Sequence, residues 1–166
     1  MLPTTAVIES SVSQQTLLDT LRQAASYEVR RLPDALRAEG VDSLVFSVTD
    51  DGRFRIFPEG LYDGWRPRIA VEGRGQVVSH ETRPQIQFEV GVTRSSLAML
   101  VTVPAVLIAL ACYNLLAENL SLLGFLGVVG FATLMEGIFV LRARSLISRA
   151  RPGLLATVRR LAEGNL

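Results

Sequence analysis

An apolar block near the middle of the chain constrains its fold more than any other feature. Between Arg94 and Arg142 lie 47 residues, of which only Glu118 and Glu136 are charged. Such a block is long enough for two membrane-spanning helices of about 20 residues each. Helices are expected because lipid offers no hydrogen-bond partner to a free backbone group. The block largely excludes a soluble globular protein, a disordered chain and a secreted disulfide scaffold.

Two spans are predicted on either side of a short polar turn. The first runs from about Leu97 to Leu116 and the second from about Leu120 to Leu141, with residues 117–119 between them. So short a connection forces the two helices to be antiparallel neighbours. Pro104 removes one backbone hydrogen bond from the first span, so a modest kink is expected there.

Small residues recur at heptad-like spacings in both spans. Helices in lipid gain no hydrophobic drive for pairing, so close backbone approach must supply it. We therefore predict that the small residues form the helix-packing surfaces by which the two spans meet; the alternative is that glycine and alanine are simply common in such helices. The residues are Ala98, Thr102, Ala105, Ala109 and Cys112 in the first span and Gly127, Gly130 and Gly137 in the second.

The distribution of arginine predicts the orientation of the hairpin. All 17 basic residues are arginine, which we interpret as a bias of composition. Arginines flank the open ends of the hairpin, whereas the turn has none. The positive-inside rule then places both termini in the cytoplasm and the turn outside. We expect a two-span protein in the inner (cytoplasmic) membrane of a bacterium.

The last 25 residues carry six arginines and a single acid, Glu163. They are expected to form a basic amphipathic helix, with Pro152 and Gly153 breaking or starting a helix. One interpretation places this tail in the membrane interface, where arginines contact lipid headgroups. The other packs it back on the open side of the sheet in the N-terminal domain. The candidate headgroup contacts are Arg142, Arg144, Arg149, Arg151, Arg159 and Arg160.

The first 94 residues predict an α+β domain. Residues 1–12 are expected to be a loose arm, followed by an amphipathic helix whose apolar stripe begins at Leu17. From Val41 the hydrophobic period changes to two, and Asp50-Asp51-Gly52 predicts a hairpin turn. We expect a four-stranded antiparallel sheet with the helix packed on its apolar face. The predicted divisions are 1–94, 95–141 and 142–166.

Residues that carry chemistry are few in this chain. The single histidine, His80, and the single cysteine, Cys112, cannot form an ordinary zinc site within one chain. No phosphate-binding loop, nucleophile elbow or acid/base pair stands out. We therefore expect no enzymatic activity, no catalytic residue, no cofactor and no metal. Because topology explains the arginines, we also expect no nucleic-acid partner.

Three residues are candidates for partner or interface contacts. Glu136 lies six residues before Arg142, about 9 Å along a helix. A charge near the centre of a bilayer costs about 2.5–3.5 kcal/mol and less toward the interface, so Glu136 reaches the interface, stays protonated, or pairs with an arginine on a partner chain. Tyr62 and Trp65 share a loop, and both residue types are favoured at membrane and protein interfaces.

These features together predict a non-catalytic, integral-membrane accessory or scaffold subunit. It would anchor or stabilise a larger membrane complex, such as an energy-transducing or transport assembly. Its expected partners are membrane lipids and other membrane-protein subunits. Two alternatives stay open: a membrane-anchored domain that binds a lipid or small ligand, and an oligomeric transporter subunit that uses Glu136.

Overall fold

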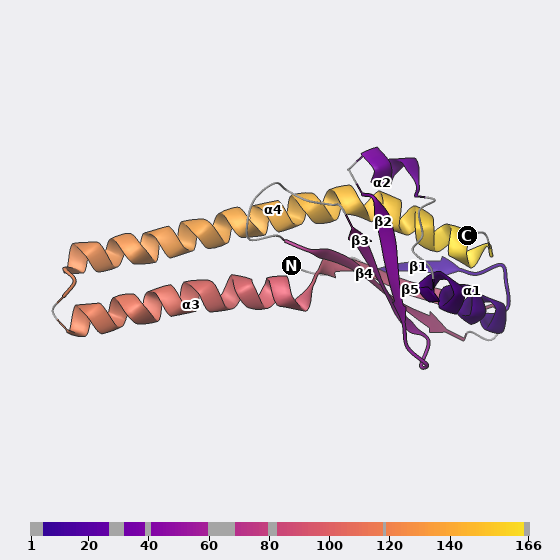
Figure 1. Cartoon of the computed structure of the whole chain (residues 1–166), viewed down its shortest axis with the longest axis horizontal. Coiled ribbons are helices and arrows are strands. Elements are labelled where there is room, and N and C mark those ends of the chain that lie inside the picture. The colour runs from indigo at the N-terminus through magenta and orange to yellow at the C-terminus, as the bar shows by residue number, and fades with distance from the viewer. Residues whose placement is uncertain are drawn as a thin grey trace. The chain divides into compact units, whose positions relative to one another are not determined.

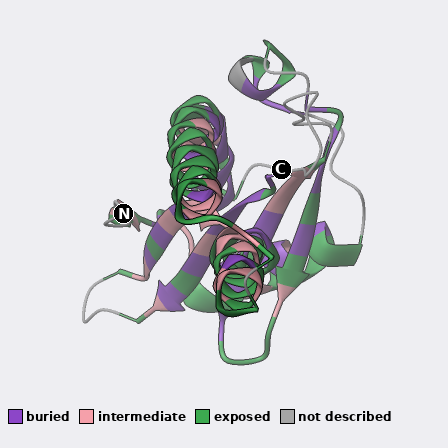
Figure 2. Ribbon diagram, turned by 90° about the vertical axis from the view of Figure 1, so that its left-hand side faces the viewer, coloured by how far each residue is buried: buried purple, intermediate pink, exposed green. Residues whose placement is uncertain are grey.

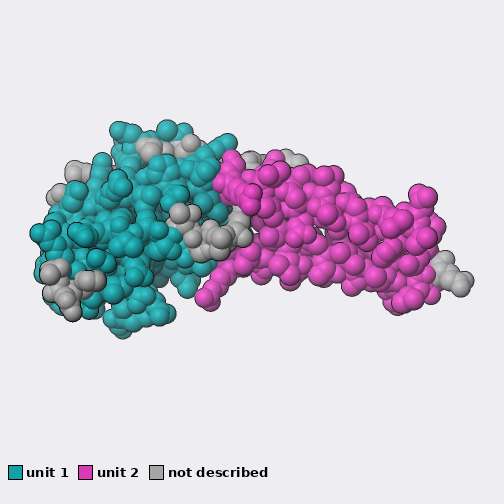
Figure 3. All heavy atoms as spheres, turned by 180° about the vertical axis from the view of Figure 1, so that it is seen from behind, with its two compact units in different colours: residues 1–92, 146–166 teal, residues 93–145 magenta. Residues whose placement is uncertain are grey.

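The chain divides into two compact units in the computed structural model, which describes residues 5–26, 32–38, 41–59, 69–79, 83–117 and 119–164. One unit comprises Met1–Val92 and Leu146–Leu166, and the other comprises Thr93–Ser145 (Figure 3). The sequence pattern separates residues 142–166 from the first 94, whereas the contacts of the folded chain join most of this last segment to the first.

A five-stranded antiparallel sheet forms the framework of the first unit. The strands follow the order β1-β5-β4-β3-β2 (Figure 1). Four strands were expected, so the sheet is larger by one. The alternating period of two is confirmed in β5, where Ile86, Phe88 and Val90 are buried. The strands are β1 (Thr5–Glu9), β2 (Ser43–Val48), β3 (Arg53–Glu59), β4 (Val71–Val78) and β5 (Gln85–Val92).

The additional strand, β1, lies where a loose arm was expected, so that prediction is wrong. It pairs with β5, which places Ala6 opposite Phe88 and Ile8 opposite Ile86. The strand has only five residues and a partially exposed pattern, so it carries too little alternation to be recognised alone. Its stability comes from the ladder that it makes with the edge of β5.

Helix α1 (Gln14–Ser26) buries one side against this unit. Leu17, Leu21 and Ala24 are buried, at a spacing of four and three that defines one helical face. The Ser13 hydroxyl accepts a hydrogen bond of 3.2 Å from the N–H of Thr16, which caps the first turn. The predicted amphipathic helix is therefore present, and its closest strand is β2.

The predicted turn between β2 and β3 is confirmed. Gly52 has a φ of 78°, a left-handed conformation that glycine adopts without strain. The Thr49 hydroxyl donates a hydrogen bond to the Asp51 carboxylate. This bond, aided by the backbone amide and the charge of Arg53, holds the pKa of the Asp51 carboxyl below its ordinary value.

Helix α4 (Leu122–Ala162) continues through Pro152 and Gly153, where a break or a new helix was expected. A stripe of four residues with no exposed surface, Ala150, Leu154, Val158 and Leu161, lies in its C-terminal part. Burial of this stripe offsets the backbone hydrogen bond that a proline removes. Gly153 allows α2 (Asp34–Ala38) to approach, since a Cβ there would lie 2.3 Å from Leu36 Cγ.

Two stacked phenylalanines fill the inner face of the sheet. The rings of Phe54 and Phe88 have centroids 6.2 Å apart and planes inclined by 15°. Gly75 is the register partner of both residues, on β3 and on β5. A Cβ at Gly75 would lie 2.1 Å from Phe54 Cζ, and one at Gly73 would lie 2.4 Å from Phe88 Cζ. The two glycines therefore provide the space that the rings occupy.

Gly75→Ala is expected to destabilise the first unit because the new methyl group overlaps the Phe54 ring. Overpacking of this kind costs about 1–3 kcal/mol, which lowers the thermal midpoint by at least about 4 °C. The matched control is Gly91→Ala on β5, where a Cβ meets only a carboxylate oxygen at 3.9 Å. Thermal unfolding of both variants in detergent, followed by near-UV circular dichroism, compares them. Equal midpoints for the two variants would contradict the packing described here.

Candidate functional site: the faces of the helical hairpin

Among the residues that the structure describes, two helices are long and apolar enough to cross a membrane. They are α3 (Arg94–Leu116) and α4, and they run side by side in the second unit (Figure 1). In their most apolar windows only 11% and 6% of the residues are buried, so the described chain leaves most of both segments uncovered. Most of their outward side is exposed, and that exposed side carries residues such as Val101, Leu123 and Leu134 (Figure 2).

Local hydrogen bonds define where α3 begins and ends. Thr93 caps its N-terminus, since its hydroxyl oxygen accepts the N–H of Ser96 at 3.4 Å. At the other end, the carbonyl oxygen of Asn114 accepts the N–H groups of Asn119 at 2.9 Å and of Leu120 at 3.1 Å. These bonds satisfy carbonyl groups at the helix end and reverse the chain into α4. Glu118, the other charged residue of the block, lies outside the described residues.

Each apolar segment of the hairpin has one buried alanine, which marks the seam, the side that faces the other helix. Ala111 on α3 is 4% exposed and Ala132 on α4 is 1% exposed. In α3 the less exposed positions recur at intervals of four, three, four and three, which is the spacing of a helix-packing stripe. These positions are Leu100, Pro104, Leu107, Ala111 and Asn114. On α4, Val128 lines a groove together with α3 residues, so it faces the same seam.

The structure places the predicted small-residue faces outside this seam. Ala98, Thr102, Ala105 and Ala109 are exposed and Cys112 is half-buried. This stripe is shifted by two residues from the seam of α3, which corresponds to about 200° around the helix. Gly127, Gly130 and Gly137 on α4 are also exposed, and a Cβ added at any of them meets nothing within 4 Å. The small residues therefore lie on the outward surface of the hairpin.

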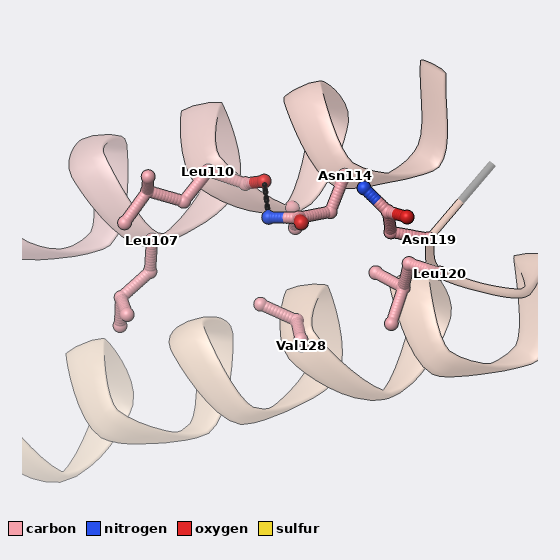
Figure 4. Close-up of a pocket in the computed structure, with 7 residues that line it drawn as sticks. Leu107, Leu110, Asn114, Asn119, Leu120 and Val128 are labelled. Carbon is pink, nitrogen blue, oxygen red and sulfur yellow. Dashed lines mark hydrogen bonds between the residues drawn. The ribbon is translucent and has the colours of Figure 1, made fainter. Parts of the chain in front are cut away.

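A shallow groove of about 250 Å³ opens between the helices beside the turn (Figure 4). The side-chain amide of Asn114 donates a hydrogen bond of 2.8 Å to the carbonyl of Leu110. The groove can accommodate an apolar group with amides at one end. Its lining is Leu107, Leu110, Ala111, Asn114, Asn119, Leu120 and Val128. One feature of the sequence indicates this groove, namely the two asparagines, Asn114 before the turn and Asn119 within it.

Glu136 is exposed on the apolar first part of α4, the part that is a candidate membrane span. Its carboxylate makes no hydrogen bond or ion pair with any other residue that the structure describes. One turn earlier, the Thr133 hydroxyl donates to the carbonyl of Val129 at 2.9 Å. Glu136 is thus the ionisable group of an otherwise apolar surface.

The six arginines predicted to contact headgroups all lie on α4. Arg144, Arg149, Arg159 and Arg160 are exposed, and Arg142 and Arg151 are half-buried. The apolar stripe of the same segment is buried within its unit, which agrees with packing on the N-terminal domain. At its end, the carbonyl of Ala162 accepts hydrogen bonds from the Ser10 hydroxyl and the Ser11 N–H, both at 3.0 Å. Contact with lipid headgroups stays a prediction.

Tyr62 and Trp65, the other predicted contact residues, lie outside the described residues, as does His80. In the described part of the chain, no group of three or more histidine, cysteine, aspartate or glutamate residues could hold a metal ion. Hydroxyls do meet carboxylates in the described part of the chain, since Ser43 donates to Glu59 at 3.0 Å and Thr49 donates to Asp51. Ser43 is buried, and Thr49 and Asp51 belong to the turn between β2 and β3.

Comparisons with known proteins do not assign a family. No protein-family model matches the chain, and the searches of curated proteins and of solved structures return no match. A function for this chain must therefore be inferred from its own residues and their positions.

Ala132→Leu is expected to destabilise the hairpin because the larger side chain enters the seam between α3 and α4. Overpacking costs about 1–3 kcal/mol. The matched control is Gly127→Leu, which adds a larger side chain to an open surface of the same helix. Unfolding of the purified variants by increasing SDS in mixed micelles measures the difference. A Gly127→Leu variant as unstable as Ala132→Leu would place the seam on the wrong side of α4.

Proposed function

We propose that the chain is an integral membrane protein and a non-catalytic accessory or scaffold subunit of a larger membrane complex. In this proposal α3 and the first part of α4 span the bilayer as a hairpin. The remainder of the chain forms an α+β domain with both termini in the cytoplasm. Both termini are placed in the cytoplasm because arginines flank the open ends of the hairpin and the turn has none. The proposed membrane is the inner membrane of a bacterium.

The observation that carries this proposal is the outward position of the small residues. The hairpin makes its own seam from other side chains, so the small-residue faces of both helices are unused within the chain. In lipid, small residues permit the close backbone approach that drives helix association. The small-residue surfaces on the outward sides of α3 and α4 are therefore suited to packing against neighbouring transmembrane helices. A scaffold subunit uses them to hold a complex together.

A membrane-anchored domain that binds a lipid or small ligand is the second candidate. The groove beside the turn favours it, because apolar side chains line its length and the amides of Asn114 and Asn119 lie near the turn. The volume of about 250 Å³ lies just below the range of about 300–1,000 Å³ typical of ligand pockets. The scaffold role has the stronger support, since this groove is open and shallow.

Assembly through the small-residue face predicts a specific loss in a double variant. In mild detergent, the native mass of the wild-type particle is expected to exceed that of one chain. Gly130→Leu combined with Gly137→Leu is expected to release the single chain without lowering its unfolding midpoint, because both sites are open within the chain. Phe131→Leu, at another exposed position of α4, serves as the control. A wild-type particle that is strictly monomeric would overturn the scaffold proposal.

The orientation can be tested with single cysteines, since Cys112 is the only native one. In a Cys112→Ala background, Asn119→Cys is expected to react with a membrane-impermeant maleimide on intact spheroplasts. Gln87→Cys, an exposed position of β5, is expected to react only after the membrane is broken. The reverse pattern would invert the topology, and labelling of both positions in intact spheroplasts would exclude a spanning hairpin.

A further inference from the structure

We propose that Glu136 forms an ion pair with an arginine or lysine on a transmembrane helix of a different protein. This inference rests on the proposed function, because it takes the hairpin to be part of a membrane complex. It adds the chemistry of the partner and excludes a second copy of this chain as that partner.

The Glu136 carboxylate has no interaction partner among the described residues. Glu136 is exposed, and no other described residue hydrogen-bonds to it or pairs with its charge. Its nearest arginine along α4 is Arg142, which lies about 240° around the helix and about 9 Å along it. Side chains on a helix pair at separations of three or four residues, so Arg142 is not placed to neutralise Glu136. An acidic side chain within a span is costly, and a cation on a neighbouring helix offsets that cost.

The two spans of this chain contain no basic residue that could pair with Glu136. No basic residue occurs between Arg94 and Arg142, so neither span carries one. A second copy inserted in the same orientation holds its own Glu136 at the same depth. Packing two copies through this face brings carboxylates together, which is repulsive. A different protein is therefore required to provide the positive charge.

The surface around Glu136 offers hydrogen-bond acceptors to a neighbouring helix. The Glu136 face comprises Gly130, Thr133, Glu136 and Gly137, and Glu136 lies at its edge toward the seam, one turn beyond Ala132. Thr133 uses its hydroxyl proton in the 2.9 Å bond to Val129, so its oxygen is left as an acceptor. Thr133 and Glu136 are three residues apart and thus neighbours on the helix surface. Two acceptors side by side match a guanidinium with its five N–H donors, or an ammonium.

The same face has room for a helix that carries such a cation. A Cβ added at Gly130 or Gly137 meets no atom within 4 Å, so no described part of the chain covers these positions. A neighbouring helix can approach the backbone closely at the glycines. The basic side chain of that neighbouring helix can then reach Glu136 and Thr133 while the two helices stay packed together.

The test places a photo-reactive residue at Leu134, an exposed position within one turn of both Gly130 and Gly137, in the full-length protein in living cells. The expected product is a crosslink to a membrane protein that has arginine or lysine within a span. Glu136→Gln keeps the size of the side chain and is expected to reduce this crosslink at least tenfold. Glu118→Gln, at the other acid of the block, is expected to leave it unchanged. A photo-reactive residue at Phe131 serves as the positional control.

Charge exchange then tests the pairing itself. Glu136→Arg is expected to abolish the crosslink, and replacing the partner's basic residue with glutamate is expected to restore it. Several outcomes overturn the inference: a crosslink to a second copy, a crosslink to a span without a basic residue, an intact crosslink in Glu136→Gln, or no crosslink at all. If the native mass shows a complex in these cases, the scaffold role survives and this inference alone fails. A monomeric particle refutes the scaffold role itself.

Discussion

Backbone hydrogen bonds inside the apolar block organise the remainder of the fold. The N–H and C=O groups of the block pair within α3 and α4, which is the arrangement that an apolar segment needs where no water is available. The short turn between them makes α4 return toward the end at which α3 began. The last segment can consequently join the first 92 residues in one compact unit. The hydrogen bonds from Ser10 and Ser11 to Ala162 close this unit between residues more than 150 positions apart.

Local periodicity predicted the elements that carry their own pattern. The alternation of β5, the Asp-Asp-Gly turn, the stripe of α1 and the two apolar helices are all visible in consecutive residues. The short strand β1 is not, because its stability comes from pairing with β5 some 80 residues later. The continuity of α4 through Pro152 is also a tertiary effect. A proline favours a break unless burial elsewhere offsets the lost bond, and here Leu154, Val158 and Leu161 are fully buried.

The candidate site shows a different limit of sequence reasoning. The spacing of four and three residues occurs twice in α3, once in the small residues from Ala98 and again, two positions later, in the seam from Leu100. Both stripes satisfy the geometry of helix packing, and the spacing does not say which neighbour each stripe contacts. In the hairpin, Leu107, Ala111 and Val128 line the space between the helices. The two helices meet along that seam because their side chains fit together there, and residue composition alone does not reveal this fit.

The two sides of the hairpin then have different physical roles. The inner side stabilises the hairpin by contacts that the chain makes with itself. The outer side of α4 carries three glycines with nothing near them, although each glycine in a helix costs up to about 1 kcal/mol relative to alanine. Nothing in the described chain compensates this cost or the cost of an unpaired carboxylate at Glu136. Both costs fall when another helix lies on that side, because close approach needs glycine and a cation needs the acid.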